Sequence, residues 1–89
     1  MEQMPKILGE RVKAARERLG WSQAELARRL RVSAYGLNLL ENGGTPYPRA
    51  NRIYALARLL GVSADYLLGL DESKESETED SEQLATVAD

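Results

Sequence analysis

Apolar residues recur along one helical face from residue 7 to residue 19. Their spacing of three or four positions is typical of an amphipathic helix, and the residues between them are mostly charged. The members of this face are Leu8, Val12, Ala15 and Leu19. Gly20 comes next and suits the left-handed backbone that ends many helices. The pattern predicts a helix over residues 7–19, preceded by an N-terminal arm at residues 1–6.

A second pattern occurs three times: an apolar residue, a serine, and a leucine four positions after that serine. The serines are Ser22, Ser33 and Ser63, preceded by Trp21, Val32 and Val62 and followed by Leu26, Leu37 and Leu67. A serine before a helix accepts a hydrogen bond from a backbone N–H of the first turn, and the flanking apolar residues pack together as a hydrophobic staple. At the first site Glu25 also completes a capping box. Each copy of the pattern predicts a helix start.

These starts, with the glycines and prolines between them, divide the rest of the chain into four more helices. Three of them are expected over residues 23–30, 34–41 and 64–68. Residues 42–48 are a loop by composition. Pro48 suits the first turn of the remaining helix, which ends at Gly61 and has an apolar face made of Ile53, Leu56, Ala57 and Leu60. The prediction is an all-α, compact five-helix domain over residues 7–70.

The composition changes abruptly after residue 70. Residues 71–82 contain no apolar residue, and such a segment cannot offset the entropy that ordering removes. Residues 71–89 hold eight acidic side chains and one basic one, a net charge of −7, whereas residues 1–70 hold 11 basic and six acidic ones, a net charge of +5. The formal charge of −2 for the whole chain conceals this division. We expect a basic domain joined to a disordered acidic tail at residues 71–89, in which the faintly apolar segment 84–88 could form a helical turn against a partner.

The residue types that are missing exclude several classes of protein. The 89 residues include no Cys and no His, which rules out a disulfide framework, a zinc finger, a thiol nucleophile and a Ser-His-Asp triad. The clustered carboxylates lie in the acidic tail, which cannot hold them in a fixed geometry. Apolar stretches are far shorter than the roughly 18 residues needed to span a bilayer. We therefore expect a cytoplasmic protein that is not an enzyme and uses no cofactor and no metal.

The short link between the predicted helices 23–30 and 34–41 is typical of a helix-turn-helix, whose second helix enters the DNA major groove. The spacing alone fits any tight three-helix bundle equally well. The wider pattern is more specific, with SQAELA at 22–27, VS at 32–33, ENG at 41–43 and LGVSADYLLG at 60–69. Over roughly residues 7–70 the chain resembles the lambda-repressor-like, Cro/C1-type (XRE) helix-turn-helix family. The resemblance implies a five-helix prokaryotic domain that binds double-stranded operator DNA, usually as a homodimer on a two-fold site.

The resemblance also implies roles for individual residues. Gln23 matches a glutamine that touches a phosphate and supports the recognition helix. Asn42 matches an asparagine whose neighbourhood offers backbone N–H groups to a phosphate. Arg16 and Glu41 match a pair that bridges the first helix to the end of the recognition helix. The alternative for this pair is a solvated surface contact worth about 0–1 kcal/mol.

The outward face of the predicted recognition helix is poor in groups that read bases. With Leu37 and Leu40 facing the core, the outward residues are Ala34, Tyr35, Asn38 and Leu39. The amide of Asn38 and the hydroxyl of Tyr35 can bond to base edges, whereas Ala34 and Leu39 offer only apolar contact with thymine methyl groups. We expect weak base discrimination by a single copy.

Phosphate contacts are expected from basic residues around this helix. The preferred candidates are Arg31 and Arg49, followed by Arg28 and Arg29; the others are Lys13 and Arg52, and for each the alternative is a solvated helix face. Arg31 stands where the motif usually has glycine. A left-handed backbone at that position would cost an arginine roughly 1–2 kcal/mol.

Two functions fit these observations. The first is a sequence-specific DNA-binding transcription regulator, expected to be a repressor, whose dimer interface would use Tyr66, Leu68 and Leu70 unless these residues complete the core. The second is a protein-interaction module, such as an antitoxin or a regulator subunit, that holds a partner with the apolar helix face or the acidic tail. The tail either aids solubility or competes with DNA for the basic surface.

Overall fold

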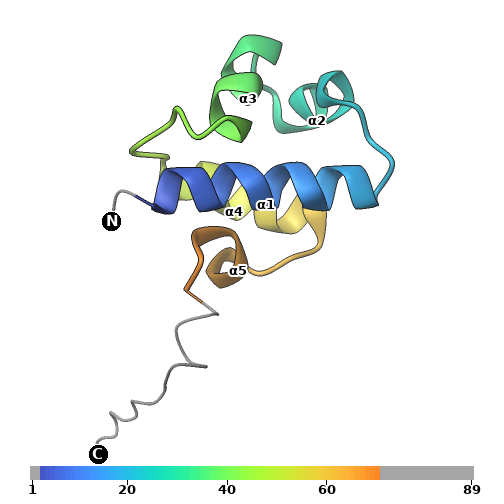
Figure 1. The fold of residues 1–89 in the computed structure, drawn as a ribbon. Helices are drawn as coiled ribbons and strands as arrows, with labels where there is room; N and C mark the ends of the chain where they lie inside the picture. Colours follow the sequence, from blue (N-terminus) through green and yellow to red (C-terminus); the bar gives the residue numbers. More distant parts are fainter. Residues whose placement is uncertain (1–2, 71–89) are drawn as a thin grey trace, which may run out of the picture.

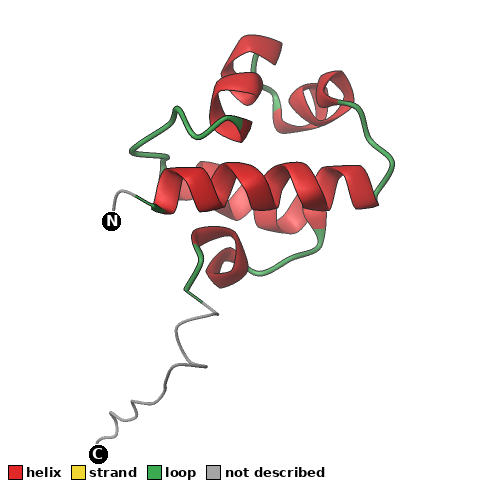
Figure 2. Cartoon of the chain, viewed as in Figure 1, coloured by secondary structure: helices red, strands yellow, loops and turns green. Residues whose placement is uncertain are grey.

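The computed structural model describes residues 3–70 and contains, within that range, five helices and no strands (Figure 2). The helices are α1 (Met4–Arg18), α2 (Gln23–Leu30), α3 (Ala34–Glu41), α4 (Ala50–Leu60) and α5 (Ala64–Leu68). In Figure 1, α2 and α3 lie on one side of α1, α5 lies on the opposite side, and α4 runs behind α1. The predicted all-α, five-helix domain is confirmed. The acidic tail at 71–89 and its segment 84–88 lie outside the described residues.

Two helix starts differ from the prediction, and both involve proline. α1 begins at Met4, three residues earlier than expected, because Pro5 falls in its first turn, where a missing N–H costs no hydrogen bond. Residues 4–6 therefore belong to the helix rather than to an arm. Pro48 is not in the first turn of α4 as predicted: the N-cap is Arg49, with an extended backbone, and Pro48 precedes it. The left-handed Gly61 ends α4 as predicted.

The three serines cap their helices as predicted. Backbone N–H groups of Glu25, Gly36 and Tyr66 donate to the hydroxyls of Ser22, Ser33 and Ser63 at 3.1, 2.9 and 3.0 Å. Each bond satisfies one of the N–H groups that a helix start leaves without a partner. These local bonds explain why α2, α3 and α5 begin where the sequence predicts.

The core is aliphatic and is centred on α1. Leu8 and Val12 of α1 are fully buried, and α1 packs against α3, α4 and α5. The other helices contribute Leu26, Leu37, Leu56, Leu60 and Leu67, all less than 2% exposed. Burying a leucine contributes about 1.5–3 kcal/mol, so these contacts hold α3 on α1, and α2 on α3 and α4, in one arrangement.

The close contact between α1 and α3 depends on Gly9. A Cβ atom at this position would lie 2.5 Å from the carbonyl oxygen of Leu40 and 2.6 Å from that of Glu41. Only a residue without a side chain lets the helices approach so closely. The sequence does not reveal this role of Gly9, because the partner backbone lies about 30 residues away along the chain.

The turn between α2 and α3 is left-handed at Arg31, with φ 66° and ψ 44°. Arg31 is the one residue other than glycine with a positive φ in the described chain. The N–H of Val32 donates to the carbonyl of Ala27 at 3.0 Å and closes the end of α2. The chain thus reverses within three residues and sets α3 across α2. None of the helices described is long and apolar enough to cross a membrane.

Candidate nucleic-acid interface

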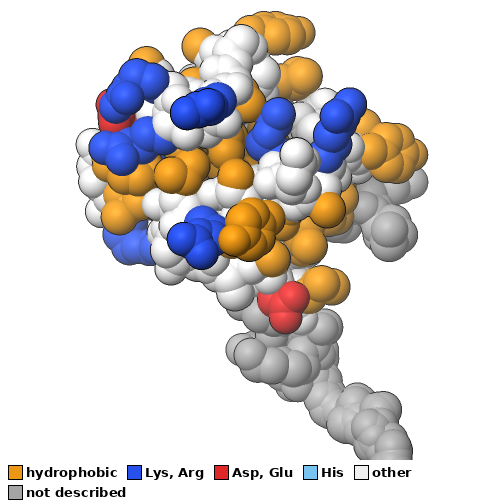
Figure 3. All heavy atoms as spheres, turned by 180° about the vertical axis from the view of Figure 1, so that it is seen from behind, with side chains coloured by type: hydrophobic (Ala, Val, Ile, Leu, Met, Phe, Trp, Pro, Cys, Tyr) orange, Lys and Arg blue, Asp and Glu red, His pale blue; other side chains and the backbone are white. Residues whose placement is uncertain are grey.

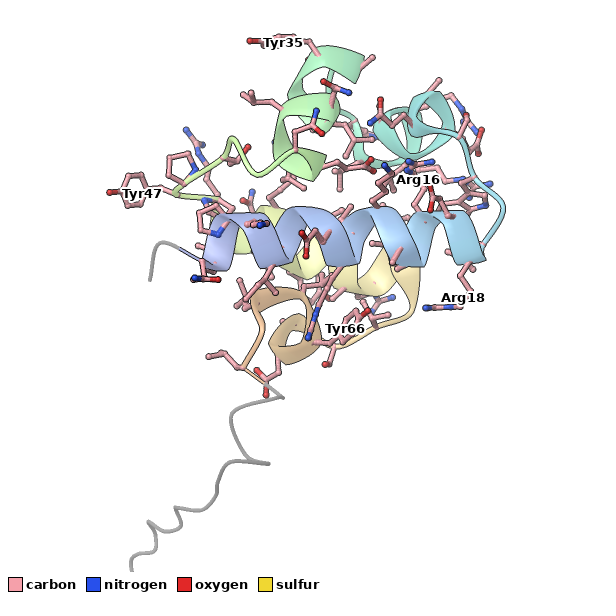
Figure 4. All side chains as sticks on the ribbon, in the orientation of Figure 1. Arg16, Arg18, Tyr35, Tyr47 and Tyr66 are labelled. Carbon is pink, nitrogen blue, oxygen red and sulfur yellow. The ribbon has the colours of Figure 1, made fainter. Side chains whose placement is uncertain are left out.

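The outer face of α3 points away from the rest of the domain. Ala34, Tyr35, Asn38 and Leu39 are all exposed, with Tyr35 at 75% and Leu39 at 40%. Figure 4 shows Tyr35 projecting from the N-terminal end of α3, on the side away from α1. Leu37 and Leu40 face the core, as the sequence predicts. The face that would meet base edges therefore has the four residues expected.

Beneath this face lies a buried ion pair between α1 and the end of α3. Arg16 Nε donates to Glu41 Oε2 at 2.7 Å, and Arg16 Nη2 donates to Glu41 Oε1 at 3.1 Å. Their side chains are 9% and 1% exposed. The hydrogen bond to Glu41 raises the pKa of the Arg16 guanidinium. This is a bidentate buried pair, not a solvated surface contact, and a third bond from Arg16 Nη1 to the carbonyl of Trp21 at 2.7 Å also fixes the α1–α2 turn.

A chain of side-chain amides runs from this pair to the outer face of α3. Gln23 Nε2 donates to Glu41 Oε1 at 3.0 Å, and Gln23 Oε1 accepts from Asn38 Nδ2 at 3.4 Å. Asn38 Oδ1 in turn accepts from Asn42 Nδ2 at 3.1 Å. Each amide keeps one N–H outside this chain, since an amide nitrogen carries two. From the sequence, Gln23, Asn38, Glu41 and Asn42 were predicted to have separate roles. The hydrogen bonds that connect them form because α2 crosses α3.

Two arginines of α2 are paired with one carboxylate. Glu25 Oε2 accepts from Arg28 Nη2 at 2.6 Å and from Arg29 Nε at 2.5 Å. These hydrogen bonds lower the pKa of Glu25 below its ordinary value. The Arg29 guanidinium also lies 4.4 Å from the centre of the Trp21 ring. The positive charge of Arg28 is therefore partly neutralised by Glu25, which could not be inferred from the sequence.

The backbone N–H groups near Asn42, which were expected to be offered to a phosphate, bond to the protein itself. The N–H groups of Asn42, Gly43 and Gly44 donate to carbonyls of α3 at 2.9–3.2 Å and close the helix. They are engaged inside the protein instead of being presented to a phosphate. Asn42 is exposed, and its side-chain amide remains the group through which it could meet a phosphate.

The remaining basic candidates border α3. Arg31 and Arg49 are both exposed; Arg31 lies in the turn between α2 and α3, and Arg49 is the N-cap of α4. Arg49 and Arg52 line a small hollow between α3 and α4. Gly36 and Thr45 also line it. Figure 3 shows Lys and Arg side chains distributed over the face of the domain seen from behind.

The three residues proposed for a dimer interface differ in exposure. Tyr66 and Leu68 are half-buried against the core, and Leu70 is 56% exposed. The guanidinium of Arg11 lies 4.5 Å from the centre of the Tyr66 ring, and Arg11 Nη1 donates to the Tyr66 carbonyl at 2.7 Å. α5 is thereby tied to α1 on the side remote from α3 (Figure 4).

Within residues 3–70, no three acidic side chains gather closely enough to hold a metal ion. What the geometry offers is an exposed helix face, an oriented amide and a surrounding set of arginines. Groups of these kinds contact the bases and phosphates of nucleic acids, and together they indicate a nucleic-acid interface.

Comparison with known proteins agrees with this geometry. Residues 9–72 match the family described as "Helix-turn-helix domain". The chain is also similar to the HTH-type transcriptional regulator ImmR of Bacillus subtilis (strain 168), with 43% identity over 75 residues, which cover 81% of this chain and 57% of ImmR. The chain thus spans little more than half the length of that relative. With the family match extending across all of α2 to α5, the chain belongs to the XRE-type helix-turn-helix family.

Proposed function

We propose that this protein is a sequence-specific DNA-binding transcription regulator that inserts α3 into the major groove. The observation that carries the proposal is the exposed face of α3, on which the Asn38 amide is held by a hydrogen-bonded chain anchored in the core. The similarity to a protein named as a transcriptional regulator supports it.

In this proposal Asn38 bonds to adenine through its amide, and Tyr35 contributes its hydroxyl. Ala34 and Leu39 contact thymine methyl groups. Phosphate contacts come from four exposed side chains around α3, those of Arg28, Arg31, Asn42 and Arg49, and from the half-buried Gln23. Gln23 has a second role, because it also orients Asn38.

One copy presents too few base-reading groups to select a site alone. We therefore propose a homodimer on a two-fold operator, with the spacing of half-sites and the shape of the DNA adding to base contacts. Repression is the proposed outcome, since a dimer bound across a promoter excludes other proteins from it. The proposed location is the cytoplasm, at the nucleoid.

The test is selection of bound sequences from a random DNA pool with the full-length chain. We expect enrichment of a two-fold symmetric site whose half-sites are about 10 base pairs apart, or a multiple of this. Asn38→Ala should remove the preference at one base position in each half-site, at a cost of about 1–3 kcal/mol. The matched control is Asn51→Ala, an exposed asparagine of α4, which should keep every base preference.

The competing function is a protein-interaction module, such as an antitoxin or a regulator subunit. The observation in its favour is the exposure of Leu39 on a helix face that offers few polar groups. Absence of any enriched sequence at low salt would overturn the DNA-binding proposal and favour this module.

A further inference from the structure

An open apolar groove lies on the flank of the domain, away from every residue proposed to contact bases. It runs between the 46–48 loop, α4 and the start of α5, and has a volume of about 1040 Å³. Met4, Ile53, Ala57 and Leu68 are among its lining residues. We call this feature the flank groove.

Two of the most exposed aromatic side chains of the described chain belong to the flank groove. Tyr47 is 90% exposed and Tyr54 is 65% exposed. Arg58 is the one charged residue that lines the groove within the described chain, and its guanidinium lies 5.9 Å from the centre of the Tyr54 ring. Large exposed apolar features of this kind mark interaction sites.

The position of the flank groove limits what can cover it in a DNA complex. α3 lies on one side of α1 and α5 on the other, and Tyr47 projects sideways from the loop that follows α3 (Figure 4). Two copies that place both recognition helices on one face of a DNA duplex stand side by side, so a contact between them would lie along their flanks. The flank groove is on such a side, whereas the exposed end of α5 lies opposite α3.

We propose that the flank groove is the surface on which a second copy of this chain docks, with Tyr47 of each copy inserted into the groove of the other. A two-fold interface uses the same patch on both partners and must be self-complementary. A protruding tyrosine beside a hollow meets that condition. The choice of a flank rests on the proposed DNA-binding function, but the association itself does not require DNA.

The area available is sufficient for a dimer of modest affinity. A buried tyrosine removes about 150–250 Å² from water, so covering Tyr47 and Tyr54 on both copies would bury roughly 600 Å². The groove walls that receive them would lose a similar area, for about 1,200 Å² in total, which is the lower end of stable interfaces. A dimer of this size would be strengthened by binding two half-sites of one DNA molecule.

Sedimentation equilibrium of the full-length chain without DNA tests the proposal. We expect reversible dimerisation with a dissociation constant of about 10–1,000 μM. Tyr47→Ser should raise this constant at least about tenfold, and Tyr54→Ser should raise it by a smaller factor. Neither substitution should change the helical circular dichroism, because both side chains are exposed.

Two matched variants complete the experiment. Tyr35→Ser removes a tyrosine of similar exposure from α3 and should leave self-association unchanged. Leu70→Ser tests the competing interface on α5 and should also have no effect on it. The proposal is overturned if the chain stays monomeric up to about 1 mM, if Tyr47→Ser leaves the dissociation constant unchanged, or if Leu70→Ser alone abolishes dimerisation. Because DNA is absent, failure here is distinguishable from failure of the DNA-selection experiment.

Discussion

At the scale of single residues, Arg31 carries a backbone conformation that favours glycine. Its φ of 66° places the Cβ atom close to the following carbonyl, which costs an L-residue roughly 1–2 kcal/mol. The side chain is exposed and lies in the turn between α2 and α3. A strained arginine at the edge of the proposed DNA-binding surface is consistent with a functional contact that offsets its cost in stability.

Arg31→Gly should therefore raise the free energy of unfolding by about 1 kcal/mol, since glycine adopts this backbone without strain. The same variant should bind DNA more weakly and with a shallower salt dependence, because it lacks the phosphate contact proposed for Arg31. Urea denaturation measures the first effect, and DNA titration at several salt concentrations measures the second. Unchanged or reduced stability would contradict the assignment of strain.

Arg16 is the residue whose loss should damage the fold most among the arginines of α1. Arg16→Ala leaves the Glu41 carboxylate buried without its counter-ion, and breaking a buried pair in this way costs about 3–5 kcal/mol. Lys13→Ala, at an exposed position of the same helix, should change stability by no more than about 0.5 kcal/mol. Equal shifts of the two thermal midpoints would count against a structural role for the pair.

At the scale of helices, the contact between α1 and α3 has no room for an added carbon. Gly9→Ala would place its Cβ 2.5 Å from the Leu40 carbonyl oxygen, and both atoms are held by backbone. We expect a loss of about 1–3 kcal/mol, although alanine normally favours a helix over glycine. In Gly36→Ala the new Cβ meets only the Ser33 hydroxyl, at 3.2 Å, so this control should lose less. The prediction fails if urea denaturation ranks the two variants the other way.

Removing the negative charge of Glu25 should increase the net positive charge of α2. Glu25→Gln releases Arg28 and Arg29 from their shared carboxylate. Random-sequence DNA should then bind more tightly at low salt, with the slope of log K against log salt steeper by about 1–2. Glu10→Gln, the same charge change at an exposed position of α1, serves as the control. Identical slopes for both variants would show that these arginines do not reach phosphates.

The elements that the sequence predicts best are those defined by local chemistry. α2, α3 and α5 have the predicted bounds because a serine cap and its staple act within five residues. The start of α1 was missed because its first turn carries Pro5 instead of a capping bond. Gly9 and the flank groove could not be inferred, since each depends on segments far apart in the chain. The outward face of α3 was predictable from helical periodicity, but the amide chain behind Asn38 was not.

At the scale of the whole molecule, the acidic residues beyond the described domain oppose its positive charge. Removing residues 71–89 changes the formal charge of the chain from −2 to +5 and keeps every helix described. We expect affinity for random-sequence DNA to rise roughly tenfold at low salt, and the gain to vanish at high salt, where such fields are screened. A full-length variant with the tail carboxylates changed to amides should show the same gain in DNA affinity at low salt as the truncated chain. No change at low salt would leave solubility as the role of the tail.

The amide chain behind α3 has a consequence for how the sequence preference of such a protein can diverge or be redesigned. Asn38 is bonded to Gln23, which is bonded to the same carboxylate that neutralises Arg16. A substitution at position 38 therefore disturbs a network that also joins α1 to α3. Ala34 and Leu39 have no polar side-chain atoms to leave unsatisfied. If α3 reads bases as proposed, new base preferences should be acquired first at positions 34 and 39, with Asn38 between them retained.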